Sequence, residues 1–177
     1  MSITPASPPR LTAVAGACLL SALLGACSHG PKATSPMPPP APVAPAARVG
    51  DAFAASTVTM RALGLIGTPY RYGGNTPDTG FDCSGLVTYV FKDMLDLRLP
   101  RTSRELAALQ GPKISPERLT TGDLVFFGDP GNVWHVGIYV GEGRFVHAPS
   151  TGGTVRMDHL EGAYWRKHYT GAKRVLY

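Results

Sequence analysis

The apolar residues of this chain change their spacing part-way along, and this change limits the fold class more than any other feature. Over 52–66, and again from Cys83 to a point before Pro100, apolar residues recur at the three- and four-residue intervals of an amphipathic helix. Beyond residue 120 they fall into short runs separated by turn residues, which is typical of strands. Helices followed by closely spaced strands predict an α+β domain with an antiparallel sheet.

The expected elements follow from these runs and from the Gly and Pro residues between them. A loop dense in Gly, Pro, Asn and Asp is expected over 67–82, and a short helix over 102–110. The turn Gly141-Glu142-Gly143 predicts a hairpin between the strands on either side of it. The expected strands cover residues 123–127, 135–140, 144–147, 154–157 and 173–177.

The first 26 residues are typical of a secretory signal rather than of folded structure. Arg10 precedes an apolar run from Leu11 to Leu24, which is shorter than the about 20 residues needed to cross a bilayer. The run closes in Leu24-Gly25-Ala26-Cys27, which resembles a bacterial lipobox and implies acylation of Cys27. By the same resemblance, Ser28 implies a periplasmic protein anchored to the outer membrane. A plain signal peptide, cleaved nearby, is the alternative.

A stretch rich in Pro and Ala follows the predicted lipidation site. Such a composition cannot bury enough apolar surface to fold and favours an extended polyproline II tether. The expected organisation is a signal over 1–26, the lipidated Cys and tether over 27–51, and one folded domain over 52–177. The net charge of +5 is scattered, without the interleaved basic and aromatic residues of nucleic-acid-binding proteins, so nucleic acid is excluded as the expected partner.

Cys83 is the only free thiol expected in the mature chain, because Cys18 leaves with the signal and Cys27 becomes a thioether. An unpaired thiol in an oxidising compartment is usually either buried or reactive. Asp82 is a suitable N-cap, so Cys83 is predicted to lie in the first turn of its helix. There, the unpaired backbone N–H groups are expected to favour the thiolate and to stabilise an oxyanion.

Two histidines can supply the base that such a nucleophile needs. His135 and His147 are predicted on neighbouring antiparallel strands, where one can activate Cys83 while the other holds its ring in place. The same three residues could instead be packed structural side chains. They could also be three zinc ligands, since zinc binds Cys and His.

Five short motifs favour catalysis. They are Tyr70-Arg71-Tyr72-Gly73-Gly74, Asp82-Cys83-Ser84-Gly85, Gly122-Asp123-Leu124-Val125-Phe126-Phe127, His135-Val136-Gly137-Ile138-Tyr139-Val140-Gly141 and His147-Ala148-Pro149. In this order the chain resembles the NlpC-type family of bacterial papain-like cysteine peptidases. The resemblance implies helices packed on a five- or six-stranded antiparallel sheet, with the nucleophile at a helix N-terminus. It also implies hydrolysis of peptidoglycan stem peptides, typically at the D-γ-glutamyl–meso-diaminopimelate bond.

The resemblance also implies individual roles. Cys83 becomes the nucleophile, His135 the general base and His147 the residue that orients it, while Tyr70 lies beside the oxyanion. The residues expected to hold the stem peptide are Asp82, Ser84, Arg101 and Ser103. No metal or cofactor is expected, and the expected partners are peptidoglycan stem peptides and the membrane that holds Cys27.

Two other functions remain open at this point. An amidase that cuts between N-acetylmuramate and L-alanine uses a similar Cys–His core. A non-catalytic wall-binding lipoprotein is the alternative outside the enzyme class, although the presence of Cys83, His135 and His147 argues against it.

Overall fold

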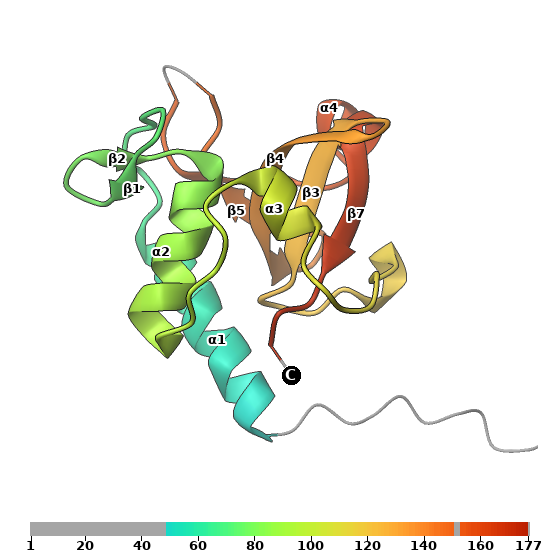
Figure 1. Cartoon of the computed structure of the whole chain (residues 1–177), viewed down its shortest axis with the longest axis horizontal. Coiled ribbons are helices and arrows are strands. Elements are labelled where there is room, and N and C mark those ends of the chain that lie inside the picture. Colours follow the sequence, from blue (N-terminus) through green and yellow to red (C-terminus); the bar gives the residue numbers. More distant parts are fainter. Residues whose placement is uncertain (1–48, 151–152, 177) are drawn as a thin grey trace, which may run out of the picture. The chain divides into compact units, whose positions relative to one another are not determined.

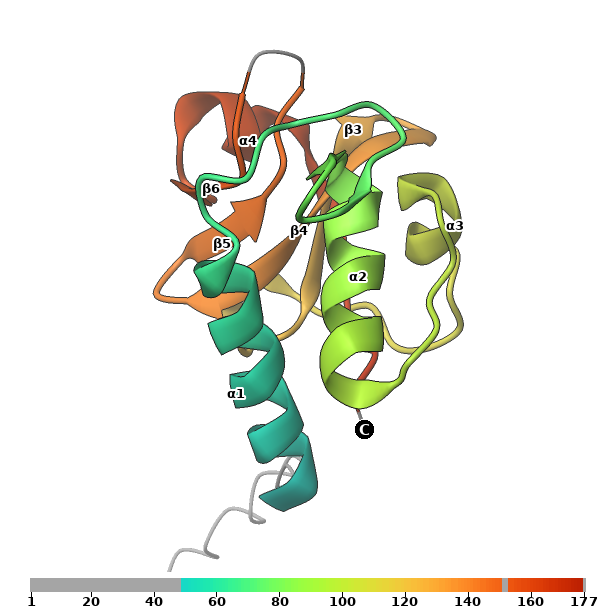
Figure 2. The ribbon, with the colours of Figure 1, turned by 90° about the vertical axis from the view of Figure 1, so that its left-hand side faces the viewer.

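Two antiparallel helices, α1 (Val49–Gly64) and α2 (Cys83–Leu95), lie side by side against one face of a sheet (Figures 1 and 2). The computed structural model describes residues 49–150 and 153–176. The predicted signal, Cys27 and nearly all of the predicted tether lie outside these residues. No helix in the described part of the chain combines the length and apolar character needed to span a bilayer.

Both helices form where the apolar spacing predicts them. On α1, Val58, Ala62 and Leu65 follow one another at the spacing of a single buried face, with Leu65 just beyond the end of the helix. The N-cap of α2 is Asp82, whose side chain accepts a hydrogen bond from the backbone N–H of Gly85 at 2.6 Å. This helix ends where Asp96 adopts a left-handed conformation with φ of 53°.

The C-terminal half forms a five-stranded sheet in which each pair of neighbouring strands is antiparallel. Its spatial order is β6-β5-β4-β3-β7. The strands are β3 (Leu124–Asp129), β4 (Asn132–Gly141), β5 (Arg144–His147), β6 (Arg156–His159) and β7 (Tyr169–Lys173). The expected α+β class, with helices packed on a five-stranded antiparallel sheet, is therefore confirmed.

The sheet separates two apolar cores. Phe126 on β3 points towards α1 and α2 and belongs to the larger core. The next residue, Phe127, points to the opposite face, where it packs with Phe145 and with Trp165 of α4 (Ala163–His168). This alternation of buried side chains on both faces explains why the strand 124–127 is apolar throughout.

Several boundaries differ from those expected. Two short strands, β1 (Asn75–Thr76) and β2 (Gly80–Phe81), pair within the predicted loop 67–82. The predicted helix 102–110 is only α3 (Ser103–Ala107), which begins with a capping box between Thr102 and Glu105, and the 3-10 helix η1 (Pro116–Arg118) follows it.

The two last predicted strands are displaced along the chain. The strand expected over 154–157 is β6, and the strand expected over 173–177 is β7, which ends at Lys173. Val175 and Leu176 are apolar because they pack against the larger core, although they form no strand. Residues 163–168 form the helix α4, which no pattern in the sequence predicts.

Candidate active site

Cys83 is the first residue of α2, so the end of the helix that carries unpaired N–H groups holds the thiol. A close approach between the helix start and the preceding loop fixes its position. A Cβ atom at Gly85 would lie 2.0 Å from the carbonyl oxygen of Gly74, and one at Gly74 would lie 2.3 Å from the carbonyl oxygen of Gly80. Glycines in the motifs around Tyr70 and Cys83 are therefore needed so that two backbone segments can touch.

The environment of the Cys83 thiol differs from the sequence expectation. Burial raises the pKa of Cys83 above its ordinary value, and the negative charge of Asp82 raises it further. The backbone N–H groups of Val136 and Ser84 act in the opposite direction without reversing the shift. The helix N-terminus thus does not by itself produce a thiolate, and the resting thiol keeps its proton at neutral pH.

His135 and His147 lie together on the sheet face that points away from α1 and α2 and is covered by α4. His135 on β4 is paired with Phe127 on β3. Both histidines are buried, with His135 6% exposed and His147 0% exposed. Nε2 of His135 lies 2.9 Å from Nδ1 of His147, and the two rings are nearly perpendicular at 87°. The predicted pairing of these histidines across neighbouring strands is present in the structure.

Burial keeps both imidazole rings neutral. It lowers the pKa of His135 to about 3, with a further lowering by His147 and an opposing effect of Asp158. Burial also lowers the pKa of His147 to about 4, again against the effect of Asp158. At neutral pH each ring therefore carries a single proton on one of its two nitrogens.

Gly137 explains part of the His135 motif. A Cβ atom there would lie 2.6 Å from the ring of Phe145 and 3.3 Å from Cβ of His147. A larger residue would push both side chains away from β4. This glycine therefore leaves the space in which His147 reaches the ring of His135.

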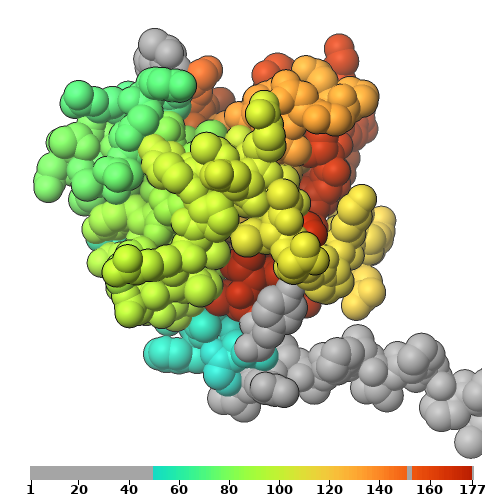
Figure 3. Space-filling view, in the orientation of Figure 1, coloured from blue at the N-terminus to red at the C-terminus, as the bar shows by residue number. Residues whose placement is uncertain are grey.

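A groove runs past Cys83 on both sides. One cavity of about 490 Å³ and another of about 450 Å³ share the residues Tyr70, Cys83 and Trp134. Figure 3 shows a hollow between the segment around residues 70–80 and the segments of the sheet and α4. The first cavity also contains His135, so the thiol and the imidazole face one space that a substrate can enter.

Tyr70 lies where both cavities meet. Burial raises the pKa of its phenol, and the charge that Cys83 carries once it ionises and the charge of Asp82 raise it further. The phenol therefore keeps its proton and can donate a hydrogen bond beside the thiol. This position is compatible with the predicted role next to an oxyanion.

The predicted substrate-binding residues gather in the second cavity. Arg101 donates to both carboxylate oxygens of Asp82 at 2.8 Å and to Oγ of Ser84 at 2.9 Å. Although burial opposes ionisation, Arg101 and the N–H groups of Gly85 and Gly73 hold the pKa of Asp82 below its usual range. Ser103, at the start of α3, lines the same cavity. The structure thus brings all four residues to one side of Cys83.

The zinc hypothesis conflicts with the orientation of the rings. The facing nitrogens of His135 and His147 are joined by a hydrogen bond and cannot both present lone pairs to one ion. Within residues 49–150 and 153–176, no group of three or more His, Cys, Asp or Glu side chains is arranged to hold a metal ion.

Two residues of the site lie outside every motif singled out in the sequence. Asp158 accepts a hydrogen bond from Nε2 of His147 at 3.0 Å, and Trp165 stacks on the ring of His135 with 5.1 Å between ring centroids. No local pattern marks either one, because Asp158 reaches His147 only through the pairing of β5 with β6. The aromatic residues within 163–168 are the sequence feature that indicates a segment packed against the rest of the domain.

Comparison with known proteins identifies the family. The profile of the NlpC/P60 family matches residues 67–174, which include Cys83, His135 and His147. The chain belongs to the NlpC/P60 family. The expected resemblance is therefore confirmed over most of the described residues.

Among NlpC/P60 proteins, the chain is similar to two from Escherichia coli (strain K12). It is 48% identical to Murein DD-endopeptidase MepH over 126 residues, which cover 69% of this chain and 46% of that protein. It is 38% identical to Probable endopeptidase NlpC over 156 residues, which cover 86% of this chain and 93% of that protein. The chain thus matches less than half of MepH but nearly all of NlpC.

A solved member of the family has the same fold. The crystal structure of the NlpC/p60 domain of peptidoglycan hydrolase SagA matches with a TM-score of 0.61 and 32% sequence identity. The match covers 68% of this chain and 98% of that domain.

Proposed function

We propose that this protein is a peptidoglycan hydrolase that cleaves stem peptides by cysteine-dependent catalysis. The observation that carries the proposal is the groove that contains Cys83 and His135, with His147 hydrogen-bonded behind the base. The names of its relatives support the substrate class, since MepH is a murein endopeptidase and SagA a peptidoglycan hydrolase. Cys83, His135 and His147 act as nucleophile, base and orienting residue.

The reaction begins from a neutral pair. Because the Cys83 thiol and the His135 ring are both uncharged, the proton moves from sulfur to the imidazole as sulfur attacks the substrate carbonyl carbon. The carbonyl oxygen then carries the negative charge. The N–H groups at the start of α2 and the phenol of Tyr70 stabilise this oxyanion.

The second half returns the proton. The imidazolium of His135 donates it to the leaving amine, the peptide bond breaks, and an acyl group remains on Cys83 as a thioester. His135 then takes a proton from water as the water oxygen attacks the thioester carbon. The carbon–sulfur bond breaks, the carboxylate product leaves, and His135 returns the proton to the sulfur of Cys83. On the other side of Cys83, the cluster of Asp82, Ser84, Arg101 and Ser103 holds the stem peptide.

Two bonds are candidates for cleavage. The family resemblance of the sequence motifs favours the D-γ-glutamyl–meso-diaminopimelate bond within one stem. The 48% identity to MepH favours a D,D bond between two cross-linked stems. The same chemistry cuts both bonds. The difference lies in which residues of the stem peptide occupy the groove.

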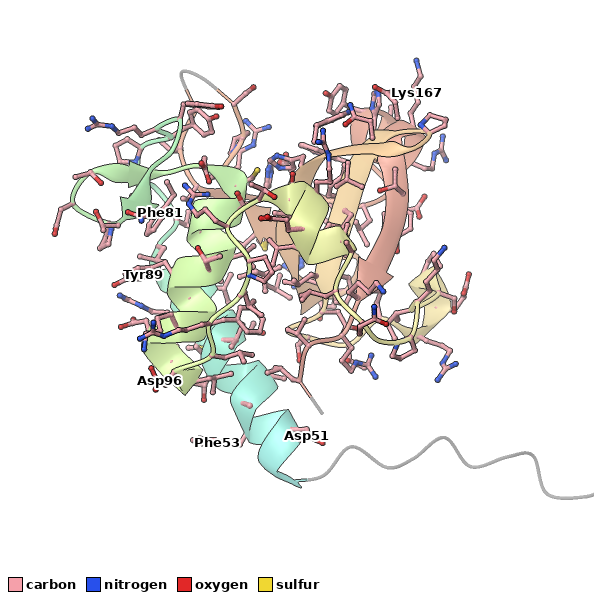
Figure 4. The ribbon with its side chains drawn as sticks, in the orientation of Figure 1. Asp51, Phe53, Phe81, Tyr89, Asp96 and Lys167 are labelled. Atoms are coloured by element: carbon pink, nitrogen blue, oxygen red, sulfur yellow. The ribbon has the colours of Figure 1, made fainter. Side chains whose placement is uncertain are left out.

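We also propose that lipidated Cys27 anchors the protein to the outer membrane, with the folded domain in the periplasm. The lipobox-like Leu24-Gly25-Ala26-Cys27 supports this location. In this proposal the tether leads into the start of α1. In Figure 4, Asp51 and Phe53 at the start of α1 lie at the same end as Asp96, which follows α2, whereas Cys83 begins the opposite end of α2.

Digestion of purified peptidoglycan tests the activity. The full-length protein should release fragments whose masses identify the lost bond, and Cys83→Ala should release none while remaining folded by circular dichroism. Loss of a D-γ-glutamyl, D,D or N-acetylmuramoyl–L-alanine bond distinguishes the two endopeptidases from an amidase. Digestion by the Cys83→Ala variant at the wild-type rate would refute the nucleophile assignment.

A further inference from the structure

Asp158 on β6 lies directly behind His147 and gathers hydrogen-bond donors on one oxygen. Its Oδ2 accepts from Nε2 of His147 at 3.0 Å, from Nε1 of Trp165 at 2.9 Å, and from Nε and Nη2 of Arg156 at 3.1 and 3.0 Å. A carboxylate with this many donors is both fixed in place and strongly favoured in its charged form.

The charge state of Asp158 decides the direction of its bond to His147. Burial opposes ionisation, but the donors from Trp165, Arg156 and His147 hold the pKa of Asp158 below its usual range. An ionised carboxylate can only accept hydrogen bonds. Nε2 of His147 must therefore carry the proton of that contact.

The direction of this bond determines which ring nitrogens of His147 and His135 carry the remaining protons. The neutral ring of His147 has one N–H, which points to Asp158, so its Nδ1 is unprotonated and must accept. The partner of that Nδ1 is Nε2 of His135, which must therefore donate. Since the ring of His135 is also neutral, its Nδ1 is left without a proton.

We propose that Asp158 is a positioning residue that fixes the tautomers of both histidines and so leaves Nδ1 of His135 free to take the Cys83 proton. The role rests on the proposed hydrolase function, in which His135 is the base. Trp165 couples the two residues physically, because its N–H holds Asp158 while its ring stacks on His135. Asp158 touches neither sulfur nor base and acts only through His147.

Nuclear magnetic resonance of histidine-¹⁵N-labelled, full-length protein reads these tautomers without substrate. In the wild type, His135 and His147 should each show a protonated Nε2 and an unprotonated Nδ1. Asp158→Ala removes the acceptor, so His147 should populate both tautomers. The kcat for peptidoglycan fragments should fall by on the order of tenfold to a hundredfold, below the roughly 10⁴-fold effect of losing a directly orienting residue, with little change in KM. Asp158→Asn should preserve the tautomers with a smaller loss, because the N–H donors of Arg156 and Trp165 keep its amide oxygen, rather than its NH2 group, towards His147.

Asp123 offers a matched control. It is a carboxylate that is 1% exposed, and it pairs with Arg174 and accepts the N–H of Thr120, with no histidine among the contacts observed. Asp123→Asn should lower stability but leave the histidine signals and kcat as in the wild type. An equal loss of kcat in this control would show that Asp158→Ala acts through general destabilisation and would overturn the proposal.

Other outcomes also decide against it. An unprotonated Nε2 on wild-type His147 refutes the proposal without any variant, and so does a folded Asp158→Ala protein with wild-type kcat and tautomers. A loss of activity with unchanged tautomers, or a loss confined to KM, would assign Asp158 to substrate contact through Arg156. If the alanine variant does not fold, Asp158→Leu retains side-chain volume and carries the same expectation. A wild type inactive on peptidoglycan would refute the hydrolase function while the tautomers are still measured.

Discussion

Acid should destabilise this protein through its two buried histidines. Burial lowers the pKa of His135 from 6.5 to about 3, and that of His147 to about 4. Between these values and 6.5, the unfolded chain binds protons that the folded protein excludes. The free energy of unfolding must therefore fall as the pH falls through this window, and it is fully retained above pH 6.5.

The size of the effect follows from the shift of a single group. Each pKa unit corresponds to about 1.4 kcal/mol. Between pH 7.5 and 4.5, excluding the proton from His135 therefore costs about 2–3 kcal/mol of folding free energy. This is a large fraction of the about 5–15 kcal/mol that stabilises a typical domain.

Urea unfolding of the reduced full-length protein at several pH values measures this cost. His135→Gln removes the group that must not titrate, so the wild type should lose about 2–3 kcal/mol more than this variant between pH 7.5 and 4.5. His159→Gln, which removes an exposed histidine from β6, controls for the loss of a histidine as such. If the wild-type and His135→Gln stabilities stay parallel over this range, burial does not exclude the proton from His135.

Three further changes have outcomes that particular contacts determine. His147 needs one acceptor for His135 and one donor, which an amide supplies, so His147→Gln or His147→Asn should retain measurable kcat/KM on a stem tetrapeptide, His147→Ala should lose more, and His135→Gln nearly all. Equal inactivity of folded His147→Gln and His135→Gln would contradict the orienting role. Cys27→Ser should release the protein from membranes without lowering its activity, and acyl labelling with fractionation would place the anchor elsewhere if the variant still carried lipid. Gly85→Ala should lower the free energy of unfolding in urea by at least about 2 kcal/mol, because its Cβ would meet the Gly74 carbonyl, whereas Gly64→Ala has open space and should change it by less than about 1 kcal/mol.

The sequence predicts the elements whose pattern is local. The spacing of Leu86, Val87, Val90 and Phe91 is enough to place α2, and the Gly141-Glu142-Gly143 turn is enough to pair β4 with β5. A helix start and a hairpin can each be predicted from a short segment. The sequence therefore suffices to place the Cys83 thiol and the two histidines on their helix and strands.

Elements that depend on tertiary packing are not predictable in this way. Val175 and Leu176 have the apolar character of a strand, but they cover the larger core while the more polar 169–173 pairs with β3. The charge state of Cys83 is a similar case. A helix start favours the thiolate, and only the folded structure shows that burial and Asp82 outweigh it.

Asp158 lies beyond sequence reasoning for a geometric reason. Its bond to His147 requires the register between β5 and β6, in which Phe145 faces Asp158 and His147 faces Arg156. A polar residue two positions away from the directly paired one carries no local signal of its partner.

The same register determines where this domain can change its length. His135, His147 and Asp158 lie on three adjacent strands, on the sheet face that α4 covers. Side chains alternate between the two faces of a sheet. Inserting one residue into β4 next to His135, with the rest of the strand still paired, would therefore turn the His135 ring towards α1 and α2. The turn at Glu142 and Gly143 bears no such constraint, since its residues lie outside the paired strands. A change in residue count at this turn can therefore leave the three side chains in place, whereas a one-residue change between the strand positions that carry them cannot.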